Sequence, residues 1–455
     1  MSERKLELNT KRTFLIGFAF FGILMMWQIF YYYVPLFLDE MLQSRFGAGE
    51  DKYNYIIGLI MSIDKVLAVI LIPLFGWLSD KTKTRYGRRM PFIMLGTTVA
   101  VLLFPFVAVM FIVDSFAGLM VLIVLMAVVM HFYRSPAVSL MPDVTPKPLR
   151  AAANGIINFV GYIGTIIGGV VTMLFLLSKP KDAGLIPYIS DNPNMIFIPF
   201  IIASVLMFVS LVLLVWKFSE NKVVQQVAPD MAKGEKLAET IEPVDEGQKL
   251  GKTDRRNFFV LFGCITLWFF AFNGMMTFGS LYARKEITLL GGALKGEWQG
   301  LGIAISVMAI AGMITFLPAI KLSNKIGRKN SILVGLALMI VTLFAASFIN
   351  ILGLPLLALF AVAGAGWAII NLNSYPMLVE MSNAKNLGRI TGYYYIASNL
   401  SQAITSICIG FVLDWLGYAA FFPYAALFMV LAFVLCLFFK TKPKQEQAQG
   451  SVSQK

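Results

Sequence analysis

Residues 71–93 read LIPLFGWLSDKTKTRYGRRMPFI, a short basic segment set between two long apolar runs. The apolar runs extend outward to about residues 53–78 on one side and 91–113 on the other. Each run matches the roughly 20 residues that a helix needs to cross the hydrocarbon core of a bilayer. The stretch therefore predicts two transmembrane helices joined by a tight, positively charged loop.

The composition of the whole chain is that of a membrane protein. The 455 residues are 58% apolar and 14% charged, and the mean hydropathy is +0.75. Soluble domains carry about 25% charged residues, so this composition excludes a soluble globule. The first apolar run, at about residues 14–38, is too long for a removed signal peptide, and no small-residue cleavage site follows it.

Twelve apolar runs have the length of a membrane helix. They lie at about residues 14–38, 53–78, 91–113, 116–141, 151–177, 195–218, 257–283, 298–320, 330–349, 354–379, 388–413 and 419–439. Inside a bilayer every backbone polar group must be bonded within the protein, which a helix achieves within one segment. We therefore predict an all-α membrane protein with twelve transmembrane helices.

The basic residues indicate how the chain crosses the membrane. The net charge is +13, from 38 basic and 25 acidic residues, an excess that in a soluble protein would suggest a nucleic-acid partner. Most Lys and Arg fall in the tails and in the loops on one side of the predicted membrane. The opposite loops contain only Arg45, Lys52, Lys179, Lys181, Arg284, Lys285 and Lys295. By the positive-inside rule, both termini are cytoplasmic. This orientation accounts for the basic excess, so no nucleic-acid partner is needed. We expect the chain to lie in the inner or plasma membrane.

The chain divides into two halves of six predicted helices each. The N-terminal half is 1–218, a cytoplasmic linker is 219–256, the C-terminal half is 257–440 and a cytoplasmic tail is 441–455. The linker mixes basic and acidic residues with Pro, Gly and Gln, which predicts a solvated segment without a site.

The two halves repeat a short basic motif at matching loops. The tripeptide GRR at 87–89 follows the second predicted helix, and GRK at 327–329 follows the eighth. Two pseudo-symmetric halves with a site between them near the bilayer midplane are typical of secondary transporters that work by alternating access.

These loops also resemble a known family. The stretch GWLSD at 76–80, followed by GRR at 87–89, resembles the signature loop of the major facilitator superfamily, and the architecture matches over nearly the whole chain. More narrowly, RYGRRMPFI at 85–93 and RSPAVSLMPD at 134–143 resemble the glycoside-pentoside-hexuronide:cation symporters and the related sucrose transporters. The resemblance implies cation-coupled import of a small glycoside or disaccharide, such as an α-glucoside or sucrose.

Ionisable side chains inside the predicted helices are the candidate coupling residues. Asp64 lies near the bilayer midplane, where a charge costs roughly 2.5–3.5 kcal/mol, so a function is expected for it. Lys65 follows it, and His131 and Arg134 lie one turn apart on the fourth predicted helix. His131 is a candidate proton relay, with an ordinary hydrogen bond to a neighbouring helix as the alternative. Arg134 can bind a carboxylate or sugar hydroxyls, or extend to the membrane surface.

The number of carboxylates predicts the coupling ion. Melibiose-type symporters of the resembled group use several carboxylates on helices 1, 2 and 4 for sodium, whereas this chain has only Asp64 in mid-helix there. A proton is therefore the expected coupling cation, with Na⁺ as the alternative, and no other cofactor or metal is expected. We expect protonation of Asp64 to release an ion pair with Arg134, an arginine that the resembled sucrose transporters also place on this helix.

Polar and aromatic side chains recur at helical spacing on several predicted helices, which is the mixture that a sugar site requires. The candidate substrate-binding residues are Gln28, Trp27, Asn154, Asn158, Tyr162, Asn273, Asn373, Tyr395 and Gln402. Alternatively, such side chains hold membrane helices together by hydrogen bonds. The expected substrate is an uncharged or weakly charged glycoside.

Charged residues at the cytoplasmic ends of the helices are candidates for a gate. They are Asp80, Arg88, Arg89, Asp143, Arg150, Glu380 and Arg389. Acidic groups are favoured near the positive starts of helices. We expect these residues to form ion pairs that latch the two halves in the outward-facing state, with orientation by positive charge as the alternative for the arginines at 88 and 89.

Other functions fit the sequence less well. The stretch GTIIGG at 164–169 comes within one residue of the Gly-Pro-x-x-Gly-Gly element of drug antiporters, so proton-coupled export of a small organic molecule is the alternative. A sensor on a transporter scaffold is a third reading. The sequence has no GxxxxGK[ST] loop and one histidine, so an enzyme is not expected. The expected partners are a sugar, the coupling proton or sodium, and the lipid bilayer, and the chain is expected to be a monomer.

Overall fold

The computed structural model describes residues 6–46, 53–176, 179–180, 194–241, 252–286, 288–289, 297–298, 302–379 and 387–440. Within these ranges twelve helices are long and apolar enough to cross a membrane, which confirms the predicted all-α membrane fold. Several helices extend beyond the predicted runs, because a helix can continue past the hydrocarbon core into polar residues that face water.

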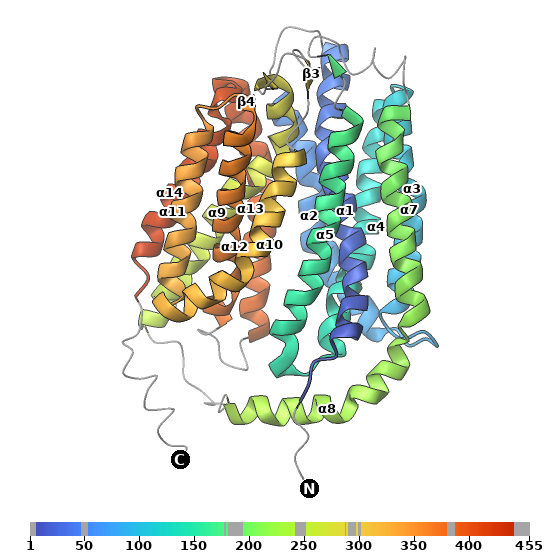
Figure 1. Cartoon of the computed structure of the whole chain (residues 1–455). Coiled ribbons are helices and arrows are strands. Elements are labelled where there is room, and N and C mark those ends of the chain that lie inside the picture. Colours follow the sequence, from blue (N-terminus) through green and yellow to red (C-terminus); the bar gives the residue numbers. More distant parts are fainter. Residues whose placement is uncertain are drawn as a thin grey trace.

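The helices form two groups of six. The N-terminal group is α1 (Thr10–Phe46), α2 (Asn54–Lys81), α3 (Met90–Ile112), α4 (Phe116–Asp143), α5 (Arg150–Leu176) and α7 (Asn194–Lys217). The C-terminal group is α9 (Lys252–Glu286), α10 (Gly302–Ile326), α11 (Arg328–Ala346), α12 (Leu354–Val379), α13 (Leu387–Leu416) and α14 (Phe421–Leu437). Figure 1 shows these groups as two bundles side by side, one in blue to green and the other in yellow to red.

A further helix, α8 (Glu220–Ile241), crosses one end of the N-terminal bundle (Figure 1). We name this end of the molecule the α8 face and the opposite end the far face. Short 3₁₀ turns precede α5 and α14, at η1 (Lys147–Leu149) and η3 (Tyr418–Ala420). In addition, β1 (Lys179–Pro180) pairs antiparallel with β3 (Glu297–Trp298), and β2 (Thr288–Leu289) pairs in parallel with β4 (Ile351–Leu352). The first of these pairings joins the two halves.

Glycines allow the helices to approach one another closely. A Cβ added at Gly164 of α5 would lie 2.3 Å from the backbone oxygen of Phe21 on α1. A Cβ added at Gly58 of α2 would lie 2.0 Å from the backbone oxygen of Ser406 on α13. Small residues are typical of such contacts between membrane helices. Gly164 thus lets α5 pack closely on α1, and the contact of Gly58 brings the two halves together.

The linker between the halves differs from the prediction. It was expected to be solvated throughout, but residues Glu220–Ile241 form α8. Val227 is only 4% exposed, and Val223 and Met231 are partly buried against the same core. Apolar side chains four residues apart therefore form one packed stripe on an otherwise polar helix. The low apolar content of the linker concealed this stripe.

Glu220, the first residue of α8, caps the start of α3. Its buried carboxylate accepts hydrogen bonds of 2.9–3.2 Å from the backbone N–H groups of Arg88, Arg89 and Met90. A helix leaves its first N–H groups without internal partners, and a negative charge there is favoured by the helix dipole. The linker is thereby fixed to the basic loop between α2 and α3.

Gly87 lies beside this cap with a φ of +116°, and an added Cβ would lie 2.2 Å from Glu220 Oε2. We expect Gly87→Ala to displace the carboxylate and lower the free energy of unfolding by about 1–3 kcal/mol, the range for overpacking or a lost cap. Thermal unfolding of the detergent-solubilised protein measures this change.

Gly327→Ala is the matched control, because Gly327 has a φ of +83° with nothing within 4 Å of the added Cβ. This substitution introduces the backbone strain of a positive φ without a collision between the new Cβ and a neighbouring side chain. Equal destabilisation by the two substitutions would contradict a role for the Glu220 cap.

Candidate functional site

Asp64 forms the centre of a buried polar cluster between α1, α2 and α4. Its residue is 2% exposed. The Tyr31 hydroxyl donates to Asp64 Oδ2 at 2.6 Å, and Lys65 Nζ forms a salt bridge with the same oxygen. His131 Nε2 lies 3.1 Å from Asp64 Oδ1 and 3.1 Å from its backbone oxygen. Both carboxylate oxygens therefore have partners from the surrounding helices.

Lys65 is held against two aromatic rings of α1. Its Nζ lies 4.8 Å from the ring centroid of Trp27 and 4.4 Å from that of Tyr31, and the two rings stack at 5.1 Å. Such cation–π contacts favour the charged ammonium, and most strongly where water is excluded. Adjacent helix positions project in different directions, but the four-carbon stem of Lys65 bends back to reach the Asp64 carboxylate.

Arg134 does not make the ion pair that was predicted. It is half-buried on α4, and among the described residues the ionic partners of Asp64 are Lys65 and His131. Arg134 lies three residues after His131, which moves its backbone about 4.5 Å further toward the α8 face. Lys65, the neighbour of Asp64 in the sequence, occupies the carboxylate. The expected Asp64–Arg134 ion pair is therefore replaced by an Asp64–Lys65 pair.

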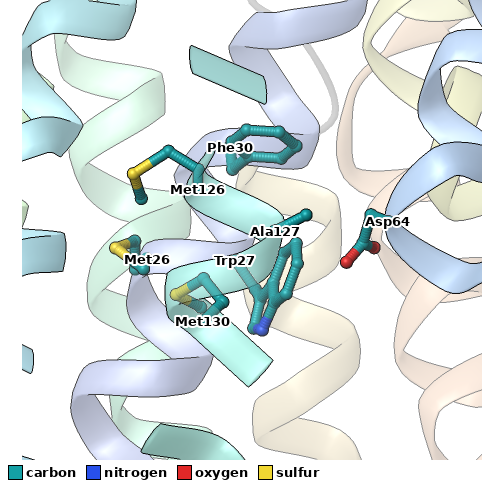
Figure 2. A pocket seen from close by; sticks show the side chains of 7 residues that line it. All are labelled: Met26, Trp27, Phe30, Asp64, Met126, Ala127 and Met130. Atoms are coloured by element: carbon teal, nitrogen blue, oxygen red, sulfur yellow. The ribbon is translucent and has the colours of Figure 1, made fainter. Parts of the chain in front are cut away.

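A small cavity adjoins this cluster. The space in it that is open to a water molecule is about 10 Å³, and it is lined by Met26, Trp27, Phe30, Asp64, Met126, Ala127 and Met130. Figure 2 shows the Trp27 indole standing between the methionines and the Asp64 carboxylate. Ligand pockets for drug-sized molecules hold roughly 300–1,000 Å³. The cavity is therefore too small for a disaccharide, and the Asp64 cluster has the dimensions of a site for a proton or a water molecule.

Three of the candidate residues, Asn154, Asn158 and Tyr162, lie at helical spacing along one face of α5, and we name them the α5 stripe. Asn154 and Tyr162 are exposed, and the half-buried Asn158 donates its amide to the backbone oxygen of Asn154 at 2.8 Å. Further along the same face of the helix, Gly169 contacts Ser306 of α10. The stripe therefore faces the C-terminal half and is left uncovered toward the α8 face.

Two candidates of the C-terminal half are half-buried and accompanied by polar or aromatic groups. Asn273 on α9 donates its amide to its own helix, and the ring of the adjacent Phe272 stacks on Trp367 of α12 with centroids 3.8 Å apart. Gln402 on α13 lies 3.3 Å from the Ser398 hydroxyl. Together they place amides and flat ring faces on this half.

Three other candidates have different surroundings. Asn373 is fully buried, where its Oδ1 accepts a 2.6 Å hydrogen bond from Ser323 of α10. It holds two helices together, which is the alternative that the sequence left open. Gln28 packs its Cβ against Gly168 of α5. The side chain of Tyr395 lies outside the described residues.

The predicted gating residues of the N-terminal half form one charged cluster at the α8 face. Arg89 contacts both Asp80 and Asp143, and Arg88 Nη2 lies 2.8 Å from Asp143 Oδ1. Arg150 instead donates to backbone oxygens just before its helix. Burial lowers the pKa of Arg150, and nearby carboxylates oppose this shift.

All these contacts lie within the N-terminal half. They join the ends of α2, α3 and α4, so in this conformation they brace one bundle and do not link it to the other. Glu380 and the side chain of Arg389, which would form the matching pair, lie outside the described residues. The latch in the outward-facing state stays a prediction.

At the far face, in contrast, charged side chains do join the halves. Arg284 near the end of α9 forms salt bridges with Glu40 and Asp39 near the end of α1. Lys285 Nζ lies 3.7 Å from Asp39 Oδ1. Both basic residues were predicted to lie in outer loops, without a role.

Asp414 near the end of α13 makes a second connection there. Its carboxylate accepts hydrogen bonds of 2.9 Å from the backbone N–H groups of Asn54 and Tyr55, which begin α2, and from the Asn54 amide. The Tyr418 hydroxyl donates to Asn54 Oδ1 at 2.6 Å. A carboxylate of one half thus caps a helix of the other half. We name this set of residues, Asp39, Glu40, Asn54, Arg284 and Asp414, the far-face gate.

Comparison with known proteins identifies the family. A sequence profile for the Major Facilitator Superfamily matches residues 16–296 and 287–454, nearly the whole chain. The chain belongs to the Major Facilitator Superfamily. It is therefore a multi-pass membrane transporter and not an enzyme, as the sequence analysis expected.

Solved structures share the fold of this transporter. The xylose transporter XylE from E. coli, in an inward-open conformation, has a TM-score of 0.67 and 14% identity, with 96% of each chain covered. The POT family transporter PepTSo has a TM-score of 0.64 and 11% identity over 99% of this chain and 100% of its own. The nucleoside transporter NupG has a TM-score of 0.60 and 13% identity over 94% and 100%. No curated protein sequence matches the chain.

Sequence reasoning missed the far-face gate of this transporter and the role of Tyr31. One signal was available, because the acidic pair at 39–40 ends the first predicted helix and the basic pair at 284–285 ends the seventh. These are equivalent positions in the two halves, and opposite charges there favour contact across the interface. No comparable pattern pointed to Asp414 or to Tyr31.

We expect Asp414→Asn to weaken the far-face gate, because the amide keeps one acceptor oxygen and loses the charge. A helix cap contributes about 1 kcal/mol, which corresponds to roughly a fivefold shift toward the open state. Ser406→Cys, in a variant without the native cysteines, places a thiol at a position that is 2% exposed beneath the gate. Its labelling rate by an impermeant maleimide from the far side should rise by about that factor.

Asp114→Asn is the control, because Asp114 also lies at the far face but pairs with Arg45 of its own half at 3.1 Å. The same loss of charge there should leave the labelling rate of the Ser406→Cys thiol unchanged. Equal labelling in the two variants would show that Asp414 does not hold the gate.

Proposed function

We propose that this transporter imports a small glycoside together with a proton by alternating access. The observation that carries the proposal is the buried Asp64 cluster, an acidic group in the membrane interior surrounded by groups that bond it in its charged form. An ionisable residue inside a membrane helix is a functional residue by default. Inner or plasma membrane location and cytoplasmic termini are part of the proposal.

Proton coupling is favoured over sodium coupling by the partners of Asp64. A sodium ion binds several oxygen ligands at once. Here one carboxylate oxygen already contacts the Lys65 ammonium and the Tyr31 hydroxyl, and the other faces His131. The Lys65 ammonium is thus the cation beside the carboxylate, at the position that a sodium ion would need. Protonation needs only one free electron pair, and it changes the charge of the cluster by one unit.

The substrate class is inferred from the groups that face the other half. The α5 stripe combines the Asn154 and Asn158 amides with the Tyr162 ring, and the opposing half offers Asn273 beside the stacked rings of Phe272 and Trp367. Amides bond sugar hydroxyls, and ring faces pack on sugar C–H surfaces. The loop motifs that resemble sugar symporters support the same class.

Export of a drug-like molecule is less favoured. The glycine-rich stretch on α5 that suggested it is fully used for packing, because Gly164 and Gly168 contact α1 and Gly169 contacts α10. Helix packing therefore accounts for these glycines without a role in export.

Asp64→Asn tests the coupling. The amide mimics the protonated acid, so we expect uphill accumulation driven by a pH gradient to be lost in proteoliposomes, while exchange of labelled sugar between equal pools continues. Asp114→Asn is the control for removal of an acidic group outside the cluster. Retained pH-driven accumulation in Asp64→Asn would exclude this residue from coupling. Uptake stimulated by sodium at constant pH would show that the coupling ion is sodium and not a proton.

Asn158→Leu tests the substrate site. Loss of one buried hydrogen bond to a sugar hydroxyl costs about 1–3 kcal/mol, so apparent affinity in counterflow with a disaccharide panel should fall roughly tenfold. Asn330→Leu removes the same kind of amide-to-backbone bond, to Ile326, at the α8 face of α11 and serves as control. Unchanged affinity in a folded Asn158→Leu variant would assign the stripe to helix packing alone.

A further inference from the structure

His131, the single histidine of the chain, is completely buried and meets Asp64 through one ring nitrogen. Nε2 lies 3.1 Å from the backbone oxygen of Asp64 as well as 3.1 Å from its Oδ1. A backbone carbonyl oxygen only accepts hydrogen bonds, so Nε2 carries the proton in this contact. In the neutral ring the other nitrogen, Nδ1, is then a bare acceptor.

Two buried polar atoms near this contact have no partner in the described part of the chain. One is His131 Nδ1, and the other is the indole Nε1 of Trp27, whose ring centroid lies 6.3 Å from that of the imidazole. Unpartnered buried polar atoms are rare and call for a water molecule or a function. The first accepts and the second donates, so one water molecule can satisfy both. The small cavity in Figure 2 is lined by Trp27 and Asp64 but not by His131, so the water is inferred from the two unpartnered atoms and not from this cavity.

We propose that His131 relays the coupling proton to Asp64, and that a water molecule between Trp27 Nε1 and His131 Nδ1 delivers it. The proposal rests on proton coupling at Asp64 and adds the route. Nδ1 takes a proton from the water, which regains one from the solvent, and the ring becomes imidazolium. The Nε2–H bond then breaks, its proton passes to Asp64 Oδ1, and a neutral ring remains with its proton on Nδ1. Loss of that proton to water and uptake of one at Nε2 reset the ring.

Asp64 Oδ1 is the oxygen that is open to the relayed proton. Among the described residues, the ionisable groups around this contact are Asp64, which His131 meets, Lys65 and Tyr31, which bond Asp64, and Arg134, one turn along α4. Lys65 and Tyr31 both bond Oδ2, which leaves Oδ1 to receive the proton.

The tautomer can be measured without any substitution. Labelling with ¹⁵N-histidine gives signals from His131 alone, because the chain contains one histidine. In nanodiscs at a pH where the ring is neutral, we expect the proton on Nε2. A neutral ring with its proton on Nδ1 would overturn the relay.

Transport assays test the route itself. In His131→Gln the amide still donates to Asp64 but cannot pass a proton on, so pH-driven accumulation should fall by about tenfold or more while sugar counterflow stays within about twofold. Trp27→Phe should slow proton-driven uptake several-fold by removing the N–H that holds the water. Trp268→Phe is the matched control, because this indole on α9 is also buried and its Nε1 also lacks a partner in the described residues, but it lies in the other half.

The outcomes separate the relay from proton coupling. Retained pH-driven accumulation in His131→Gln, or equal effects of the two tryptophan substitutions, would overturn the relay. If Asp64→Asn then still loses accumulation, proton coupling stands without it. Retention in both Asp64→Asn and His131→Gln would overturn proton coupling as well.

Discussion

The pair of charges formed by Asp64 and Lys65 inside the membrane is the constraint on which the N-terminal half depends. Either charge alone in a low dielectric would be strongly unfavourable. The pair is tolerated because a hydroxyl, an imidazole and two aromatic rings from neighbouring helices surround it. Helices α1, α2 and α4 must therefore meet at this level.

The sequence predicted the architecture well and the contacts less well. Twelve helices and two halves follow from length and hydropathy, because a bilayer allows few other structures. Asp64 was identifiable from its depth alone. Its partner Lys65 was not identifiable from the sequence. The angle between two adjacent positions on a helix gives the direction in which a side chain starts, but not where the end of a long lysine side chain lies. The α8 helix was missed because a few apolar residues in a largely polar segment give a weak signal until a surface is available to pack against.

Contacts that depend on tertiary structure were beyond the sequence. The Glu220 cap joins residues 130–132 positions apart, and the bonds of Asp414 to the start of α2 span 359–360 positions. Acidic residues in polar loops are common, and nothing in their local sequence tells which helix they will cap. Both contacts use the same physics, since each offers a carboxylate to N–H groups that a helix cannot satisfy internally.

The cap between the halves has one more consequence. When the far face opens, the first N–H groups of α2 lose the Asp414 carboxylate, but water can replace it, so the opened helix end carries no unsatisfied donor. Separation of the halves at this point is therefore readily reversible. While the carboxylate is in place, the amide protons of Asn54 and Tyr55 are protected from solvent. Their rate of hydrogen exchange thus reports how often the transporter opens to the far side.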